Sequence, residues 1–135
     1  MGGYTEGGFS NELFACELTS TTISCRALSL GCPDAPVSNA VPDALAPRYA
    51  HTLVAHGSFL FVYGGSNLDS ATSAFAPVFK YATEQCFWEQ LPSQAGTAAV
   101  GRYEHAAVVM GHWLLVQGGH DTGGAPSASM WAYPL

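Results

Sequence analysis

Positive charge is scarce in this sequence. The 135 residues include one lysine, Lys80, and three arginines against ten acidic residues, and the formal net charge is −6. Charged residues make up 10% of the chain, compared with about 25% in ordinary globular domains. Nucleic-acid phosphates and anionic lipid surfaces are bound by clustered lysine and arginine. The composition therefore argues against a nucleic-acid partner and against an anionic membrane surface.

Long apolar runs and helical periodicity are also missing. A membrane helix needs about 18 consecutive apolar residues. The longest candidate run, residues 106–116, is interrupted by Gly111 and His112, so we expect no membrane insertion. No stretch keeps a 3.6-residue period over three turns. Hydrophobic residues nevertheless reach 48%, which predicts a packed core built from strands.

The four cysteines give limited information. An even number of cysteines in a lysine-poor chain is typical of an oxidising compartment, which tilts the expected localisation towards extracellular rather than cytoplasmic. Four cysteines allow three pairings, and the sequence does not choose among them. Their spacing matches no common zinc motif. They are Cys16, Cys25, Cys32 and Cys86.

The chain repeats itself with a constant shift. The block Arg48-Tyr49-Ala50-His51 recurs 54 positions later as Arg102-Tyr103-Glu104-His105. Two glycine features recur with the same shift: the single glycines Gly57 and Gly111, and the pairs Gly64-Gly65 and Gly118-Gly119. Several anchors in one register indicate an internal structural repeat.

Each complete copy of this repeat predicts four short strands separated by turns. Two apolar strands flank the single glycine, and a polar loop, an aromatic strand and a strand carrying Trp88 follow the glycine pair. We expect a first unit at 1–28 that holds only the latter part of a copy, beginning at its pair Gly2-Gly3. A complete second unit spans 48–91, and a third unit at 102–135 lacks its last strand. Strands that are apolar on both faces are typical of sheets stacked on both sides.

This order of features resembles the kelch repeat, whose period is about 50 residues. The resemblance covers nearly the whole chain and implies an all-β fold, namely part of a kelch-type β-propeller built of four-stranded antiparallel blades. The first unit departs from the pattern with Cys25 in the tryptophan position, and the third departs with Gln117 where Tyr63 precedes the glycine pair. Propellers close with about 4–8 blades. We therefore expect a fragment whose remaining blades belong to a longer chain, so its first residues do not bear on localisation.

The residues that repeat are interpreted as scaffold, because a feature present in every blade is explained by packing shared by every blade. The five histidines share no ligand spacing, so we expect no metal site. No catalytic motif is present, and we expect neither a cofactor nor enzymatic activity. The structural residues are Gly2, Gly3, His51, Gly64, Gly65, Trp88, His105, Gly118 and Gly119.

Binding residues are expected in the loops. In an up-and-down sheet the connections after the second and fourth strands emerge at the same end, and we call this the loop end of the units. Long loops on a rigid scaffold are where binding residues usually lie. The candidates are four loop residues that do not repeat and two arginines that border the loops and suit an acidic ligand group: Asn67, Asp69, His120, Asp121, Arg48 and Arg102.

The kelch resemblance implies a protein partner bound through this end. Two alternatives remain open. One is a segment of a galactose-oxidase-like propeller enzyme, which would carry a copper site of Tyr, His and Cys. The other is a carbohydrate-binding propeller, suggested by aromatic residues such as Phe75.

Overall fold

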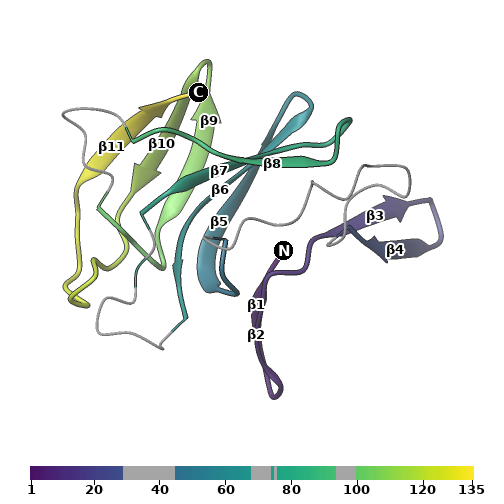
Figure 1. Cartoon of the computed structure of the whole chain (residues 1–135), viewed down its shortest axis with the longest axis horizontal. Helices are drawn as coiled ribbons and strands as arrows, with labels where there is room; N and C mark the ends of the chain where they lie inside the picture. Colours follow the sequence, from purple (N-terminus) through teal and green to yellow (C-terminus); the bar gives the residue numbers. More distant parts are fainter. Residues whose placement is uncertain (29–44, 68–73, 75, 94–99) are drawn as a thin grey trace.

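All regular elements of the protein are β-strands. The computed structural model describes residues 1–28, 45–67, 74, 76–93 and 100–135, and within them it contains eleven strands, β1 to β11, and no helix. The all-β expectation is confirmed. The strands form separate antiparallel sheets that do not close into a ring (Figure 1). Within the described residues there is also no helix long and apolar enough to cross a membrane.

The second unit forms a four-stranded antiparallel sheet with the strand order β5-β6-β7-β8. Its strands are β5 (Tyr49–His56), β6 (Phe59–Ser66), β7 (Val78–Ala82) and β8 (Phe87–Gln90). Gly57 has a positive φ of 57°, which lets the chain reverse tightly between β5 and β6. β6 and β7 are largely buried because both lie inside the sheet and are covered on both faces.

The third unit forms a three-stranded sheet with the order β11-β10-β9. Its strands are β9 (Ala106–Met110), β10 (Trp113–Gln117) and β11 (Met130–Pro134). The turns between β5 and β6 and between β9 and β10 lie at one end of the sheets, at the top of Figure 1. The connection from β10 to β11 lies at the other end, at the bottom of the same view.

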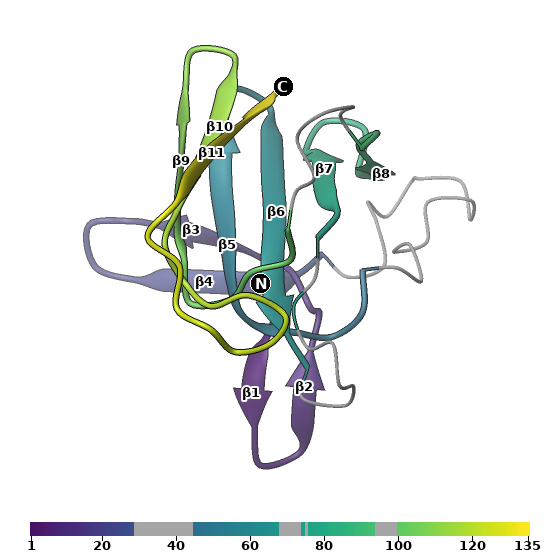
Figure 2. The same ribbon diagram turned by 90° about the vertical axis from the view of Figure 1, so that its left-hand side faces the viewer.

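The second and third sheets stack face to face. Figure 2, which looks from the side of the third unit, shows its strands in front of β5 and β6. Side chains from both sheets form one buried cluster, and each such side chain contributes roughly 1.5–3 kcal/mol when fully buried. The cluster consists of Phe61, Tyr63 and Val78 from the second unit with Leu114, Val116 and Tyr133 from the third.

Two tyrosine hydroxyls extend this interface to the chain between the sheets. The hydroxyl of Tyr63 donates a hydrogen bond to the carbonyl of Val100 at 2.7 Å. The hydroxyl of Tyr133 donates to the carbonyl of Pro92 at 2.6 Å. Both phenol groups thus bury their rings and still satisfy their polar ends.

The first unit begins with a small hairpin that the sequence pattern did not indicate. Residues after the first glycine pair were expected to form a polar loop, but β1 (Gly3–Thr5) pairs with β2 (Gly8–Ser10). The rings of Tyr4 and Phe9 face each other across this hairpin with centroids 5.2 Å apart. A cross-strand aromatic pair stabilises such a hairpin, and the short polar turn hides that signal in the sequence.

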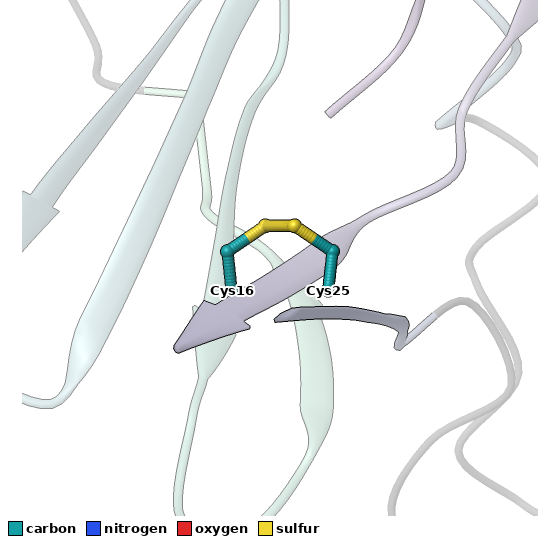
Figure 3. The surroundings of a disulfide bond; sticks show 2 residues. All are labelled: Cys16 and Cys25. Carbon is teal, nitrogen blue, oxygen red and sulfur yellow. A yellow bond between two sulfur atoms is a disulfide. The ribbon is translucent and has the colours of Figure 1, made fainter. Parts of the chain in front are cut away.

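The same unit continues with β3 (Phe14–Leu18) and β4 (Ile23–Ala27), which a disulfide joins. Cys16 and Cys25 are direct cross-strand partners with Cα atoms 4.1 Å apart, and Figure 3 shows the bond between them. This pairing is one of the three that the sequence left open. Cys86 is buried and also disulfide-bonded, and Cys32 lies outside the described residues.

The disulfide stands where the second unit has an aromatic pair. The N–H of Leu28 donates to the carbonyl of Leu13, just as the N–H of Leu91 donates to that of Val78, and these bonds align the two hairpins. In that alignment, the cysteine pair matches the cross-strand pair Tyr81 and Trp88, whose ring centroids lie 4.9 Å apart. A covalent link therefore replaces ring packing at this position.

A second buried cluster joins the first unit to the second. It covers the face of the β5–β8 sheet that points away from the third unit. Leu13 from the first unit is only 3% exposed and Leu45 from the connecting segment is 0% exposed. The full cluster is Leu13, Leu45, Val62, Phe79, Tyr81, Cys86 and Trp88.

Candidate functional site

Each Arg-x-x-His block begins with an arginine that is buried against its own glycine pair. Arg48 is 0% exposed, and its Nη1 donates to the carbonyl of Gly64 at 3.0 Å. Arg102 is 6% exposed, and its Nη1 donates to the carbonyl of Gly118 at 2.9 Å. Both arginines were candidates for an acidic ligand group. Their guanidinium groups lie inside the scaffold on carbonyl oxygens, so neither enters the binding proposal below.

The same blocks connect consecutive units. The N–H of Gly65 in the second unit donates to the carbonyl of Arg102 in the third at 2.8 Å. The N–H of Gly3 in the first unit donates to the carbonyl of Arg48 in the second at 2.9 Å. An Arg-x-x-His block and the glycine pair of the preceding unit therefore form one repeated contact, which we call the joint.

The histidine of each joint packs against the first glycine of the preceding pair. A Cβ atom at Gly64 would overlap the carbonyl oxygen of Arg102 and lie 2.5 Å from Cε1 of His105. A Cβ atom at Gly2 would lie 2.8 Å from Cε1 of His51. On its other side His105 approaches the second unit through Nε2, which is 2.9 Å from Oγ1 of Thr52. Only glycine allows this approach.

Burial in the joint keeps both histidine rings neutral. Burial lowers the pKa of His105 to about 4, and the nearby charge of Arg102 acts in the same direction. Burial followed by the charge of Arg48 lowers the pKa of His51 to about 4. A buried ring loses the solvation that its charged form needs. Both histidines are therefore uncharged packing elements at neutral pH.

At the loop end, His120 belongs to a small ordered group. Its ring stacks on that of Tyr103 with centroids 5.3 Å apart and an interplanar angle of 22°. The two residues also exchange backbone hydrogen bonds of 2.9 and 3.1 Å. Nδ1 of His120 lies 3.3 Å from Oε2 of Glu104, whose side chain is 57% exposed. This candidate residue is therefore held in place and partly accessible.

Asp121, the next candidate, shapes its own loop. Its Oδ1 accepts hydrogen bonds from the N–H groups of Gly123 and Ala125, both at 2.9 Å. A carboxylate that accepts from residues two and four positions ahead fixes a turn. Asp121 positions the loop next to His120, and one of its oxygens is already used.

A second aromatic group lies at the start of β5. The rings of Phe9 and Tyr49 are stacked at 5.5 Å with an interplanar angle of 18°. Tyr4 extends this stack through Phe9 and is 68% exposed. We call the rings at the loop end the aromatic rim. It consists of Tyr4, Phe9, Tyr49, Tyr103 and His120.

The two halves of the rim are tied together by the backbone. Tyr49 and Tyr103 hold the same place in the repeat, 54 positions apart. The residues that follow them, Ala50 and Glu104, have positive φ values of 53° and 55°, and the N–H of Glu104 donates to the carbonyl of Ala50 at 3.0 Å. A non-glycine residue in this conformation is strained. The surrounding contacts hold the starts of β5 and β9 side by side despite that strain.

Of the rim, reasoning from non-repeating residues found His120 and missed the four other rings. A signal was present for two of them, since the second position of both Arg-x-x-His blocks is tyrosine. Of the remaining candidates, Asn67 is half-buried after the end of β6, and it has interaction partners. Asp69 and Phe75 lie outside the described residues. In the part of the chain that the structure describes, no three His, Cys, Asp or Glu residues gather as metal ligands would.

Comparison of the sequence with models of known families and with curated proteins gives no match.

Proposed function

We propose that the chain is part of a kelch-type β-propeller that binds a protein partner through its loop end. The observation that carries the proposal is the contrast between the two sets of residues that this end brings together. The repeating arginines and His105 are buried in the joints, and His51 is partly buried there. The aromatic rim, in contrast, includes the 68%-exposed ring of Tyr4 and is held by stacking and backbone hydrogen bonds.

Rings held in this way suit a protein interface. Tyrosine offers a large apolar surface with a polar tip and loses little conformational freedom on binding. Tyrosine is also enriched among the residues that dominate interface energies. Because the rim is attached to stacked sheets, its rings are arranged before the partner arrives, which lowers the entropic cost of association.

The repeated joint supports the propeller part of the proposal. The two joints use the same atoms: a glycine N–H donates to an arginine carbonyl at 2.8 and 2.9 Å. An interface that is reproduced with equal geometry between successive units builds a regular array, and radial repetition of small antiparallel sheets is the propeller solution.

Site-specific photo-crosslinking tests the proposal. We would place p-benzoylphenylalanine at Tyr4 in the rim or at Phe87, which begins β8 at the opposite end of the second sheet and is 44% exposed. Expressed in the source cells, the Tyr4 variant is expected to form a discrete protein adduct and the Phe87 variant none. Equal adducts from both positions, or none from Tyr4, would refute binding through the loop end.

Affinity for the captured protein then tests the rim. Tyr4→Ala is expected to weaken binding about tenfold, equivalent to about 1.4 kcal/mol, whereas Phe87→Ala leaves it unchanged. A carbohydrate ligand is the second candidate, because exposed rings also suit sugar faces. Glycan binding that disappears in Tyr4→Ala while no protein adduct forms would favour that candidate.

A further inference from the structure

Little positive charge is available at the loop end. The protein has four lysine and arginine residues, and the structure describes all of them. Arg48 and Arg102 are 0% and 6% exposed, and their guanidinium groups donate to carbonyls inside the joints. Lys80 lies towards the opposite end, where its Nζ is 5.3 Å from the ring centre of Phe59 at the start of β6. Arg26 lies in β4, whose hairpin extends in a different direction from β1 and β2 (Figures 1 and 2).

Negative charge, in contrast, lies next to the rings of the rim. Glu104 directly follows Tyr103, and its side chain is 57% exposed. Glu6 is exposed in the turn between β1 and β2, two residues after Tyr4. Neither of these carboxylates, nor that of Asp121, forms an ion pair with a lysine or arginine of the described residues. The rim therefore combines aromatic rings with carboxylates that no basic side chain neutralises.

The repeat shows that the scaffold does not need the carboxylate of Glu104. Ala50 holds the same place 54 positions earlier, with a φ of 53° compared with 55° at Glu104. A methyl group is sufficient at this position, although the backbone conformation is the same. The N–H of Glu104 donates to the carbonyl of Ala50, so Glu104 lies where the two halves of the rim meet. Its exposed side chain is placed to contact a partner that lies on both halves.

From these observations we propose that the loop end recognises a positively charged segment of its protein partner, with arginine as the best-suited residue. This inference rests on the proposed function and names the chemistry of the partner. A cation over the face of a tyrosine ring is attracted to that ring. The planar guanidinium group of arginine stacks on an exposed ring such as that of Tyr4, and it donates paired hydrogen bonds to a carboxylate such as that of Glu104.

This charge preference is the reverse of the one expected from the sequence. Arg48 and Arg102 suited an acidic ligand group, but the burial of both guanidinium groups removes their charge from the binding surface. The net charge of −6 acts in the same direction as the exposed carboxylates. Opposite charges on the two partners speed their encounter, and salt screens this effect. We therefore expect binding of a basic segment to weaken as salt is added.

A set of synthetic peptides tests the charge preference. The probe is a fluorescein-labelled peptide with a short repeat of Gly-Ser-Arg. Two comparison peptides replace each arginine by citrulline, which keeps the shape of the side chain without its charge, or by glutamate. Binding to the 135-residue chain is followed by fluorescence anisotropy at low and at physiological ionic strength. We expect the arginine peptide to bind about tenfold more tightly than the citrulline peptide, and the glutamate peptide not to bind. Equal binding of the arginine and citrulline peptides would overturn the proposal.

Two glutamine variants locate the binding on the protein. Glu104→Gln removes one negative charge from the rim and is expected to weaken binding of the arginine peptide about threefold, within the range of an exposed ion pair. Glu84→Gln removes the same charge from the exposed turn between β7 and β8, at the opposite end of the second sheet, and is expected to leave binding unchanged. Equal weakening in both variants would mean general attraction to an acidic protein and would overturn the proposal.

The mapped position of the Tyr4 adduct separates this proposal from the proposed function. An adduct on a partner segment that contains arginine or lysine supports both. An adduct on an acidic segment would leave binding through the loop end intact and would overturn the charge preference. If Tyr4 gives no adduct, the proposed function fails, and the peptide set alone decides whether the rim binds cations.

Discussion

We predict that alanine at two equivalent glycines lowers the stability of the protein to different extents, because their surroundings at the joint differ. Gly64 and Gly118 occupy the same place in the repeat, with φ values of 69° and 72°. Alanine at either position adopts a left-handed conformation at a cost of about 1–2 kcal/mol. This cost is common to both variants and cancels in their comparison, so the difference reports the surroundings of the added methyl group.

Those surroundings differ sharply. At Gly64 the methyl group would overlap the backbone carbonyl of Arg102 and press on the ring of His105, and a backbone atom cannot rotate away. Overpacking of this kind costs about 1–3 kcal/mol in addition. At Gly118 the nearest atom lies 3.7 Å away, which is ordinary contact. We expect Gly64→Ala to lose about 2–5 kcal/mol of unfolding free energy and Gly118→Ala about 1–2 kcal/mol.

Urea denaturation of the 135-residue chain, followed by tryptophan fluorescence, measures both losses. The m-value must stay constant for the comparison to hold, since a change in m indicates a change in the exposed surface rather than in stability. Equal losses for the two alanine variants, or a larger loss at Gly118, would refute the close approach of units at the joint.

Three further predictions concern the hairpin, the rim backbone and acid. Serine at both Cys16 and Cys25 opens a link with a sequence separation of 9, which corresponds to about 2.6 kcal/mol of loop-closure entropy; faster amide exchange in β3 and β4 checks it, and unchanged exchange would count against it. Ala50→Gly relieves the positive φ and is expected to raise stability by about 0.5 kcal/mol. Ala55→Gly, at a paired position near the end of β5, lowers it by about 0.5–1 kcal/mol, and thermal melting should give these opposite signs. Because folding depresses the pKa of His105 from 6.5 to about 4, the unfolded chain binds more protons between these values. The stability that the neutral His105 ring allows is therefore fully present above pH 6.5 and is lost as the pH falls towards 4. A urea midpoint that does not fall over this interval would contradict this prediction.

The repeat could be predicted from the sequence because close steric contact fixes the residue type at its glycine and histidine positions. The approach of His105 to Gly64 needs both residue types at fixed positions, and a constant shift of 54 exposes such a requirement directly. The strands between the anchors follow from apolar runs ended by glycine turns. The all-β character and the location of the paired sheets were therefore readable without coordinates.

Whether an individual side chain is buried or exposed could not be predicted from the sequence in this way. Arginine is usually exposed, and the sequence placed Arg48 beside the loops as a ligand contact. Its burial depends on the carbonyl of Gly64, which only the folded turn brings within 3.0 Å. The rim was hidden for a related reason, because stacking of Tyr49 on Phe9 joins residues from two units.

The pairing of the cysteines could not be predicted from the sequence either. Cys25 was recognised in the tryptophan position, yet nothing in the spacing showed that Cys16 would stand opposite it. The β3–β4 register decides this, since Phe14 pairs with Ala27 and places the two cysteines face to face. Cys25 departs from the repeat, but its disulfide still joins β4 to β3, as ring packing of Trp88 on Tyr81 joins β8 to β7.

The central claim is that the Arg-x-x-His blocks are internal joints between units, with their histidines buried and neutral. The most direct test is an NMR titration of the His105 ring in the intact chain. We predict a pKa of about 4, depressed from the ordinary value of 6.5 by burial and by the charge of Arg102. A pKa near 6.5 would mean that the ring is solvated, and it would contradict the joint as described.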